Sequence, residues 1–350
     1  MPYTIHAKPL QQLTRDIFAA AGAPADIAAV VAESLVTTNL FGHDSHGVLR
    51  VKQYVNMIRD DLIKPAERPR IRKRSGATAM VTNGYGFGQT GARFAAKLAI
   101  ELGRKHGIAA VSLGQTTHIG RLGEYTQLIA AAGLIGIGFT SGSMFSGWVA
   151  PYGGREKVFS TNPMSFAVPC GGEGTLLLDF ATAGMAHGKV LLARAKGESV
   201  PQGMMLDKNG RPSTDASIVD DGAVLLAMGA YKGSGLSMMM EIIPTLLAGK
   251  RPIVSPDFHY GNPTLLMALS LDAFDDETDF VQQVEALKRH VKSVKPAEGF
   301  DEVLLPGEPE SRSYAQRVRA GIPLPDSVWA DLQALAEELS VALPTLDAAT

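Results

Sequence analysis

The chain has 350 residues, of which 45% are hydrophobic and 19% charged, and its formal net charge is −2. This length predicts two or three domains around a large core, and the composition excludes a disordered chain. The lack of a basic excess argues against nucleic acid as a partner, and the lack of a long apolar run argues against a membrane span. The single cysteine, Cys170, excludes an internal disulfide framework and a cysteine-rich zinc site, and it fits a cytoplasmic protein.

Helical periodicity dominates the first 60 residues. Apolar residues between Leu10 and Phe18 recur every three or four positions and predict a first helix. Asp26 is placed to cap a second helix, and a third is predicted from Val48 to about Asp60. Three amphipathic helices expose apolar faces, so this segment must pack against another layer.

Strands and helices alternate from about residue 70 onwards. Strands are predicted at residues 71–74, 79–82, 109–113, 134–139, 165–168, 175–179 and 265–271, and helices at 92–105 and 123–132. This order is typical of an α/β or α+β domain. The turn-rich stretch 141–174 interrupts the alternation, and turns of this kind often carry functional sites.

The second half of the chain is less regular. A helix is predicted to end near Gly197, and a polar loop over residues 201–221 follows it. Residues 232–247 are apolar almost throughout and predict a buried helix, in which the methionines at 238–240 fill the core. A polar helix, a turn at Pro306 and two closing helices complete the predicted elements.

Residues 86–91 read Gly-Phe-Gly-Gln-Thr-Gly and match the glycine pattern of dinucleotide-binding turns. A predicted strand precedes them and a predicted helix follows, as the pattern requires. A Rossmann unit also needs an acidic residue about 20 positions further on, after the next strand. Gly114, Gln115 and Thr116 stand there instead. We therefore interpret residues 86–91 as a glycine-rich turn and not as a pyrophosphate site.

A histidine, an arginine and a tyrosine come together near the start of the third predicted helix. His46 lies in a short turn, and Arg50 and Tyr54 follow at the i, i+4 spacing of one helix face. Arginine can bind a carboxylate through two parallel hydrogen bonds, and histidine titrates near neutral pH. The set suits a small acid with an oxo group, whose oxygen the histidine can protonate. From this chemistry alone, a surface turn capped by Asp44 or Ser45 is an equal alternative.

Three further patterns involve nearby polar residues. His118 directly follows a predicted strand, where α/β proteins often hold ligands, although a lone histidine there is more often structural. His43 and His46 have a spacing that could bind a metal, but no cysteine supports such a site, so we expect no metal. Ser45 lacks the flanking glycines of a hydrolase nucleophile.

Eight short motifs occur in a fixed order along the chain. They are Asp44-Ser45-His46-Gly47, Thr117-His118-Ile119-Gly120, Pro151-Tyr152-Gly153-Gly154-Arg155, Thr161-Asn162-Pro163, Asp179-Phe180-Ala181-Thr182, Tyr231-Lys232-Gly233, Pro306-Gly307-Glu308 and Gly321-Ile322-Pro323-Leu324. Each motif is weak alone, but the ordered set is specific. With these motifs the chain, from about Leu13 to Leu339, resembles the malate/L-lactate dehydrogenase family of type 2 oxidoreductases, and most of all its bacterial hydroxycarboxylate dehydrogenase B branch.

The resemblance implies an α+β fold that is unlike the Rossmann dehydrogenases. Such a fold has a largely antiparallel nucleotide-binding sheet and a helical domain built from N- and C-terminal segments. Here the helical domain would comprise residues 1–70 with 295–345, and the NAD(P)-binding α/β domain residues 71–294. An inserted subdomain is expected around residues 120–165. The resemblance also implies a homodimer that binds its cofactor between the domains.

The resemblance further implies roles for individual residues. His46 would transfer a proton, and His118 holds the position with this role in some relatives, so both are predicted catalytic residues. The predicted substrate site comprises Ser45, Arg50, Tyr54 and Thr161, with the substrate carboxylate on the arginine. The predicted cofactor site comprises His46, His118, Ile119, Gly120, Asn162, Leu178, Asp179, Phe180, Ala181, Thr182, Lys232, Pro306, Gly307 and Glu308. Arg121 departs from the pattern of many relatives, and it would contact a second anionic group or form a surface ion pair.

The implied chemistry is interconversion of a small 2-hydroxy acid and its 2-oxo acid with NAD or NADP. One alternative is NADPH-dependent reduction of a cyclic imino acid, either piperideine- or pyrroline-2-carboxylate, where the proton goes to nitrogen. A third interpretation is a non-catalytic nucleotide-binding protein, which the presence of both His46 and Arg50 disfavours. The sequence leaves open the acid, the choice of NAD or NADP, and which of the two histidines transfers the proton.

Overall fold

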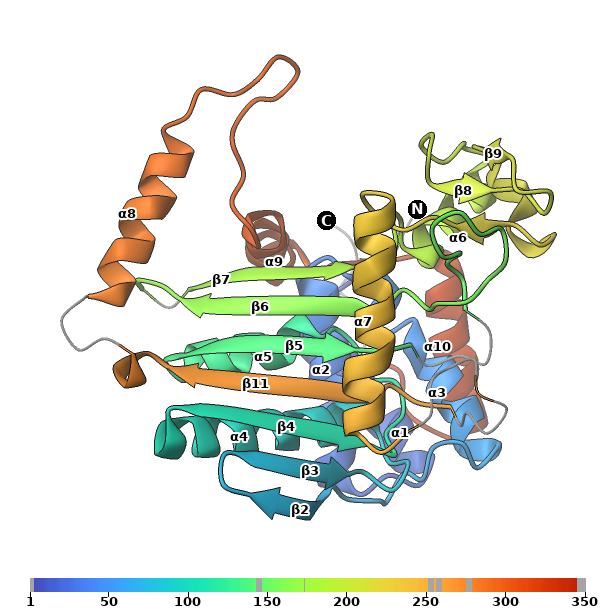
Figure 1. The fold of residues 1–350 in the computed structure, drawn as a ribbon. Helices are drawn as coiled ribbons and strands as arrows, with labels where there is room; N and C mark the ends of the chain where they lie inside the picture. The colour runs from blue at the N-terminus through green and yellow to red at the C-terminus, as the bar shows by residue number, and fades with distance from the viewer. Residues whose placement is uncertain are drawn as a thin grey trace.

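A seven-stranded sheet forms the centre of the molecule (Figure 1). The computed structural model describes residues 3–142, 147–172, 174–250, 255, 260–274 and 279–344. In spatial order the strands are β2 (Arg70–Ser75), β3 (Thr78–Thr82), β4 (Ile108–Gly114), β11 (Thr264–Ser270), β5 (Leu134–Thr140), β6 (Pro163–Pro169) and β7 (Thr175–Ala181). In this sheet β3 and β4 run parallel, and the other neighbouring pairs are antiparallel. The expected largely antiparallel sheet is therefore confirmed.

Two helices cover one face of this sheet. Helix α4 (Gly88–His106) is the crossover between β3 and β4, and a parallel pair requires such a connection. Its inner face is rich in alanine, which lets the helix lie close to the strands. Helix α5 (Gly123–Ala131) packs beside it, and together they bury Val111 and Leu113 of β4.

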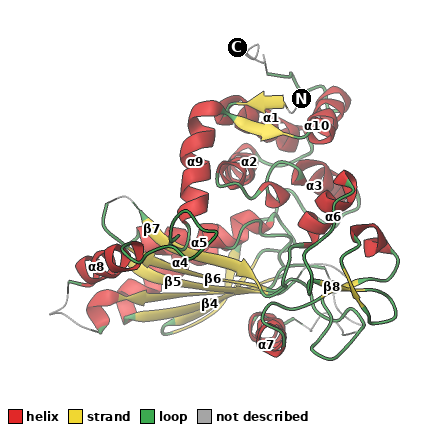
Figure 2. Cartoon of the chain, turned by 90° about the horizontal axis from the view of Figure 1, so that it is seen from above, coloured by secondary structure: helices red, strands yellow, loops and turns green. Residues whose placement is uncertain are grey.

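A helical layer unites the two ends of the described chain (Figure 2). It contains α1 (Ala7–Ala20), α2 (Ala25–Leu40), α3 (Arg50–Arg59), α9 (Glu308–Ala320) and α10 (Asp326–Glu338). Strand β1 (Tyr3–Ile5) pairs antiparallel with β12 (Ile322–Leu324) within this layer. Phe18, Tyr54 and Trp329, all buried, share one apolar core. The expected helical domain of N- and C-terminal segments is thus present, while its residue boundaries remain predictions.

A small third unit lies beside the sheet. It contains α6 (His187–Lys196) and a sheet of β8 (Met205–Leu206), β9 (Pro212–Ser213) and β10 (Val224–Leu225). Its own core includes Val149, Met205 and Val219. The prediction of a polar loop over residues 201–221 was therefore incomplete. Met205 and Val219 bury apolar side chains in this core, and the segment forms short strands and a 3-10 helix (Ala216–Asp220).

Two sequence predictions about helices are wrong. Helix α2 begins at Ala25 after Pro24, so Asp26 lies inside the first turn and does not cap it. Its carboxylate instead pairs with Arg68. Helix α7 (Tyr231–Leu247) is not buried all round, because its sheet-facing side carries small and polar residues and its outer side is apolar. Met238 and Met239 are 50% and 43% exposed, so they do not fill the core, whereas Met240 does.

Helix α8 (Phe280–Lys292) has no buried residue and projects from the body of the molecule (Figure 1). The chain returns from it to α9 through a loop that ion pairs hold together. Lys292 contacts Glu302 and Glu308, and Arg312 contacts both carboxylates as well. Within the described residues, no helix is both long and apolar enough to cross a bilayer.

The glycine-rich turn at residues 86–91 is the start of α4, and it packs against protein backbone. A Cβ atom on Gly88 would overlap the carbonyl oxygen of His118 and that of Thr117. The Gly88 N–H donates to the Thr117 hydroxyl at 3.0 Å. A residue larger than glycine does not fit at position 88, because the loop that carries His118 lies directly against it.

We expect Gly88→Ala to destabilise the protein by about 1–3 kcal/mol, since the methyl group meets backbone that cannot rotate away. Denaturant unfolding measures this loss. Gly235→Ala is the matched control, because its Cβ would point into open space on α7 and should not destabilise. Equal stability of the Gly88→Ala protein and the wild type would contradict the packing described here.

Candidate active site

The turn that carries Ser45 and His46 is fixed from both ends of the chain. Residues Asp44–His46 form a 3-10 turn after α2, as the sequence predicted. Asn39 accepts from the Val48 N–H at 2.8 Å and donates to Asp44 at 2.6 Å. Arg317 of α9 donates to both carboxylate oxygens of Asp44, at 2.6 and 3.0 Å. The C-terminal helix therefore holds an N-terminal turn in place.

The rings of His46 and His118 face each other across this turn. Their centroids are 5.5 Å apart and their planes differ by 28°. The Ser45 hydroxyl lies 2.9 Å from Nδ1 of His46. The Arg50 guanidinium is oriented by two hydrogen bonds, from Nε to the Ser45 carbonyl at 2.8 Å and from Nη1 to Gln53 at 2.7 Å. Two histidines and an arginine thus share one small volume.

His118 makes a second set of contacts on its Nδ1 side. The Tyr54 hydroxyl lies 2.6 Å from His118 Nδ1, and the Gly120 N–H donates to the same atom at 3.3 Å. Gln89 donates to the Tyr54 oxygen at 3.0 Å. Tyr54 is fully buried, so it reaches His118 from inside the helical layer. The predicted residues His46, Arg50, Tyr54 and His118 are therefore neighbours in space.

Burial and positive charge keep both histidines neutral. Burial lowers the pKa of His46 to about 3, and the charge of Arg50 acts in the same direction. The pKa of His118 lies well below its usual range for the same two reasons. Burial raises the pKa of Tyr54 to about 12, so this phenol keeps its proton. The cluster therefore carries the single positive charge of Arg50 beside two neutral imidazoles.

Most segments of the predicted cofactor site meet at β7. The Asp179 carboxylate accepts from the Gly123 N–H at 2.8 Å, which ties β7 to the loop that follows His118. The Thr182 hydroxyl donates to the carbonyls of Thr161 and Asn162, and the Thr182 carbonyl accepts from Met228. Strand β7 thus joins loops that lie far apart in the sequence.

The turn Pro306-Gly307-Glu308 also packs on β7. A Cβ atom on Gly307 would lie 3.0 Å from the carbonyl oxygen of Leu177. The Glu308 carboxylate accepts from the Leu305 N–H at 2.9 Å and from Lys292 at 3.0 Å. On β7 itself Leu178 is 43% exposed, while Phe180 and Ala181 are half-buried. Lys232 is exposed on the first turn of α7.

Two residues of the predicted cofactor site use their polar groups in hydrogen bonds within the protein. The buried Asn162 side chain accepts from the Gly142 N–H and donates to the Ser237 carbonyl, both at 3.0 Å. Ile119 buries its side chain under the sheet, and its N–H and carbonyl bind Asn262 and Tyr125. These residues shape the loops around the site through packing and internal hydrogen bonds.

Sequence reasoning missed several residues that shape the site. Asn262 binds the Ile119 N–H and the Ser141 carbonyl, so it joins two site loops. Gln89 lies inside the glycine-rich pattern, and that pattern assigns a role to the glycines but none to the Gln89 amide. Asn39 is an ordinary polar residue near the end of α2. Neither Asn39 nor Asn262 stands in a recognisable motif, so no local signal could have found them.

Arg121 is buried, so its interpretation as a surface ion pair is wrong. Its guanidinium lies 4.5 Å from the centre of the Phe41 ring, and one nitrogen donates to Gln127. Its Nε and Nη1 are buried and have no hydrogen-bond partner in the described part of the chain. His43 lies nearby with its Nε2 3.7 Å from Glu310, and no cluster of three potential metal ligands occurs among the described residues. A buried arginine with two unused donors is the chemistry that an anionic ligand requires.

Comparison with known proteins gives one consistent result. The profile of the malate/L-lactate dehydrogenase family matches residues 5–333. An L-lactate dehydrogenase of Cupriavidus necator is 35% identical over 341 residues, which cover 96% of this chain and 97% of that protein. Hydroxycarboxylate dehydrogenase B of Escherichia coli strain K12 is 32% identical over 348 residues, which cover 98% of this chain and 96% of that protein. The solved structure of sulfolactate dehydrogenase from Methanocaldococcus jannaschii has a TM-score of 0.88 at 30% identity, over 97% and 98% of the two chains.

The depressed histidine pKa values predict how stability depends on pH. An unfolded histidine binds a proton below about pH 6.5, whereas folded His46 does so only near a pKa of about 3. Between these values the unfolded state binds more protons, so stability rises with pH and falls on acidification. We expect wild type to lose up to about 1.4 kcal/mol per pH unit more than His46→Gln in this window.

Urea unfolding at about pH 5.5 and about pH 7.5 measures this difference. His6→Gln, at an exposed position before α1, is the control for loss of any histidine. If His46→Gln and His6→Gln show the same pH dependence as wild type, His46 is not held in the neutral form by folding.

Proposed function

Because this chain belongs to the malate/L-lactate dehydrogenase family, a family of enzymes, we propose that it interconverts a small 2-hydroxy acid and its 2-oxo acid with NAD or NADP. The observation that carries this proposal is the cluster of His46, His118 and Arg50 around one small volume. Family membership favours an enzyme over a non-catalytic nucleotide-binding protein. The proposed place of action is the cytoplasm.

Arg50 is the proposed anchor of the substrate carboxylate. Its Nε bond to the Ser45 carbonyl fixes the plane of the guanidinium, while Nη2 makes no hydrogen bond within the described residues. A carboxylate can occupy Nη2 and replace Gln53 at Nη1, which gives the bidentate geometry that arginine favours. The bound acid would place its C2 oxygen beside the two imidazole rings.

His46 is the proposed proton-transfer group. Its neutral imidazole can accept the proton of a 2-hydroxyl group, and the Ser45 hydroxyl can compensate on Nδ1 by donating or accepting. A substrate carboxylate on Arg50 also neutralises a charge that lowers the pKa of His46. Substrate binding therefore makes His46 a better proton acceptor at the moment when a proton must be taken up.

The residues around β7 fit a nicotinamide dinucleotide. Leu178 and Phe180 offer apolar surface for flat rings, and Lys232 and the unused donors of Arg121 suit anionic phosphates. A bound cofactor would supply the hydride in the reaction. The proposed holders of the cofactor are the backbone of His118 and Gly120, β7 residues 178–182, Lys232 and the turn 306–308.

A spectrophotometric screen of 2-oxo acids and cyclic imino acids with NADH and NADPH tests the proposed function. We expect turnover of a small 2-oxo acid, and replacement of His46 by alanine should lower kcat about 10²–10⁴-fold. Arg50→Lys keeps the charge but loses the fork, so kcat/KM should fall about 10-fold or more.

A cooperative unfolding transition at the wild-type urea concentration is the control for intact folding of both variants. If only cyclic imino acids react, the protein is an imine reductase. If both variants keep wild-type kcat/KM for the best acid, the proposed roles of His46 and Arg50 are wrong.

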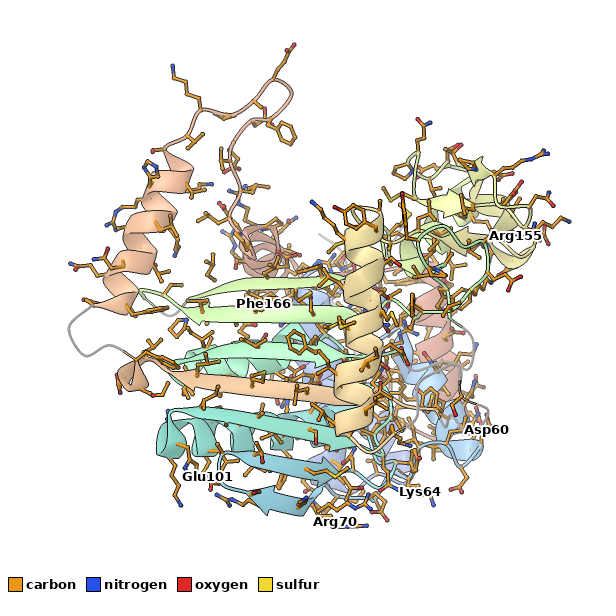
Figure 3. The ribbon with its side chains drawn as sticks, viewed as in Figure 1. Asp60, Lys64, Arg70, Glu101, Arg155 and Phe166 are labelled. Atoms are coloured by element: carbon orange, nitrogen blue, oxygen red, sulfur yellow. The ribbon has the colours of Figure 1, made fainter. Side chains whose placement is uncertain are left out.

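We propose that a second copy of this chain covers the apolar surface around α7. Leu246 and Leu247 of α7 are 52% and 56% exposed. On the same side of the sheet, Phe166 stands in register between Ile137 and Leu178 (Figure 3). Exposed apolar side chains on one side of a sheet are typical of protein interfaces, and the family resemblance implies a homodimer.

Light scattering coupled to size-exclusion chromatography tests this surface. We expect a dimer for wild type and a shift to monomer for Leu247→Glu, because a charge in an apolar interface costs about 2 kcal/mol or more. Leu62→Glu, in the loop after α3, is the control for an exposed leucine elsewhere and should stay dimeric. A monomeric wild type would disprove the proposal.

A further inference from the structure

The two histidines of the active site have different hydrogen-bond environments. We propose that His118 acts as a permanently neutral donor through its Nε2–H, and that His46 alone moves the proton. This inference rests on the proposed function and divides between the two rings a role that the sequence left open. It predicts that His118 polarises the C2 oxygen of the substrate without giving up its own proton.

The Gly120 backbone decides the tautomer of His118. A backbone N–H can only donate, and that of Gly120 points at His118 Nδ1 from 3.3 Å. Nδ1 must therefore present a lone pair, so the proton of the neutral ring sits on Nε2. The direction of the peptide N–H is fixed by the backbone, and the Tyr54 hydroxyl contacts the same ring nitrogen. Gly120 adopts a φ of +76°, a conformation that glycine tolerates, so the chain can turn directly after this N–H.

The remaining hydrogens follow from that assignment. Since Nδ1 is an acceptor, the Tyr54 hydroxyl 2.6 Å away must donate to it. The Tyr54 oxygen is then free to accept, and the Gln89 amide donates to it at 3.0 Å. The chain from Gln89 through Tyr54 to His118 is thus polarised in one direction. Gly120, Tyr54 and Gln89 therefore act as positioning residues for the Nε2–H of His118.

The charges around His118 also oppose a proton on Nδ1. Arg50 and Tyr54 face it from α3, and His46 faces it from the preceding turn. Tyr260 also lies close, with its hydroxyl bound to the His118 backbone. A proton on Nδ1 would turn the Gly120 hydrogen bond into a donor–donor contact beside the Arg50 charge. The Gly120 contact persists when a substrate carboxylate neutralises Arg50, so it continues to disfavour an imidazolium at His118 in the complex.

His46 differs because no backbone N–H among the described residues donates to its Nδ1. Its Nδ1 faces the Ser45 hydroxyl at 2.9 Å, and a hydroxyl can donate or accept. His46 can therefore exist with the proton on either nitrogen or on both. In the oxidation direction the substrate hydroxyl proton passes to His46 Nε2 as the O–H bond breaks. In reduction the same proton returns to the oxygen, and the His118 N–H bond stays intact throughout.

The division of roles has a clear benefit for the reaction. Negative charge develops on the C2 oxygen as its proton leaves, and a fixed neutral donor stabilises it. A second titrating histidine would compete with His46 for the same proton. A donor that cannot lose or gain a proton avoids that competition across the working pH range.

Nitrogen NMR of the free protein labelled at histidine tests the tautomer without any substrate. We expect His118 to show an unprotonated Nδ1 and a protonated Nε2 from about pH 5 to about pH 8. Tyr54→Phe removes one of the two donors to Nδ1, so its His118 should become easier to protonate. A wild-type His118 with a proton on Nδ1, or one that titrates in this range, would overturn the inference.

Kinetics then separate the two histidines. His118→Gln keeps a neutral N–H near the position of Nε2, so kcat should stay within about 10-fold of wild type and the pH profile of kcat/KM should keep its shape. His118→Ala removes the donor and should lower kcat about 10²–10³-fold. His46→Gln should lower kcat about 10²–10⁴-fold and abolish the limb of the pH profile that reports the base.

These outcomes distinguish failure of the inference from failure of the proposed function. An inactive wild type whose His118 has the expected tautomer would disprove the dehydrogenase activity and leave the ring assignment intact. An active wild type in which His118→Gln is as impaired as His118→Ala, with a changed pH profile, would make His118 a proton-transfer group and overturn the inference.

Discussion

The ion pair between Arg317 and Asp44 is the interaction on which the rest of the site depends. Arg317 belongs to α9, and Asp44 opens the turn that carries Ser45 and His46. The pair is bidentate and only 17% of the arginine side chain is exposed, which makes it stronger than an ordinary surface pair. The Arg317 guanidinium also binds the Asn39 carbonyl at 2.6 Å, so the end of α2 is fixed at the same time. Helices from both ends of the chain thereby set the position of one imidazole.

Periodicity predicted most elements of the sheet and its covering helices. Strand β4 and helix α5, for example, lie within one or two residues of their predicted bounds. Predictions from local patterns were wrong where one pattern is compatible with two structures. The apolar run of α7 indicated burial, yet the residues that face the sheet include Ser237 and Glu241, which bind Asn162. The number of apolar residues in a helix does not show whether its apolar face packs on the sheet or lies on the outer side of the molecule.

The candidate site was predictable where function concentrates unusual residues in a short segment. His46, Arg50 and Tyr54 are close in sequence, so helical spacing alone placed them together. The partners of His118 come from α3, the start of α4 and the loop before β11, and no sequence pattern connects these segments. The glycine-rich turn illustrates the difficulty: its interpretation as a turn gave no hint that Gly88 and Gln89 support the loop and the ring of His118.

The pairing of β1 with β12 affects how the protein is made. Ile5 and Ile322 are register partners in this small sheet, and they share a core with Phe18 and Trp329. A ribosome adds about 5–20 residues per second, so the first helices wait many seconds for the strand that completes their layer. Their apolar faces stay open to solvent throughout that interval. Apolar surface that stays uncovered while a chain is being synthesised is prone to aggregation.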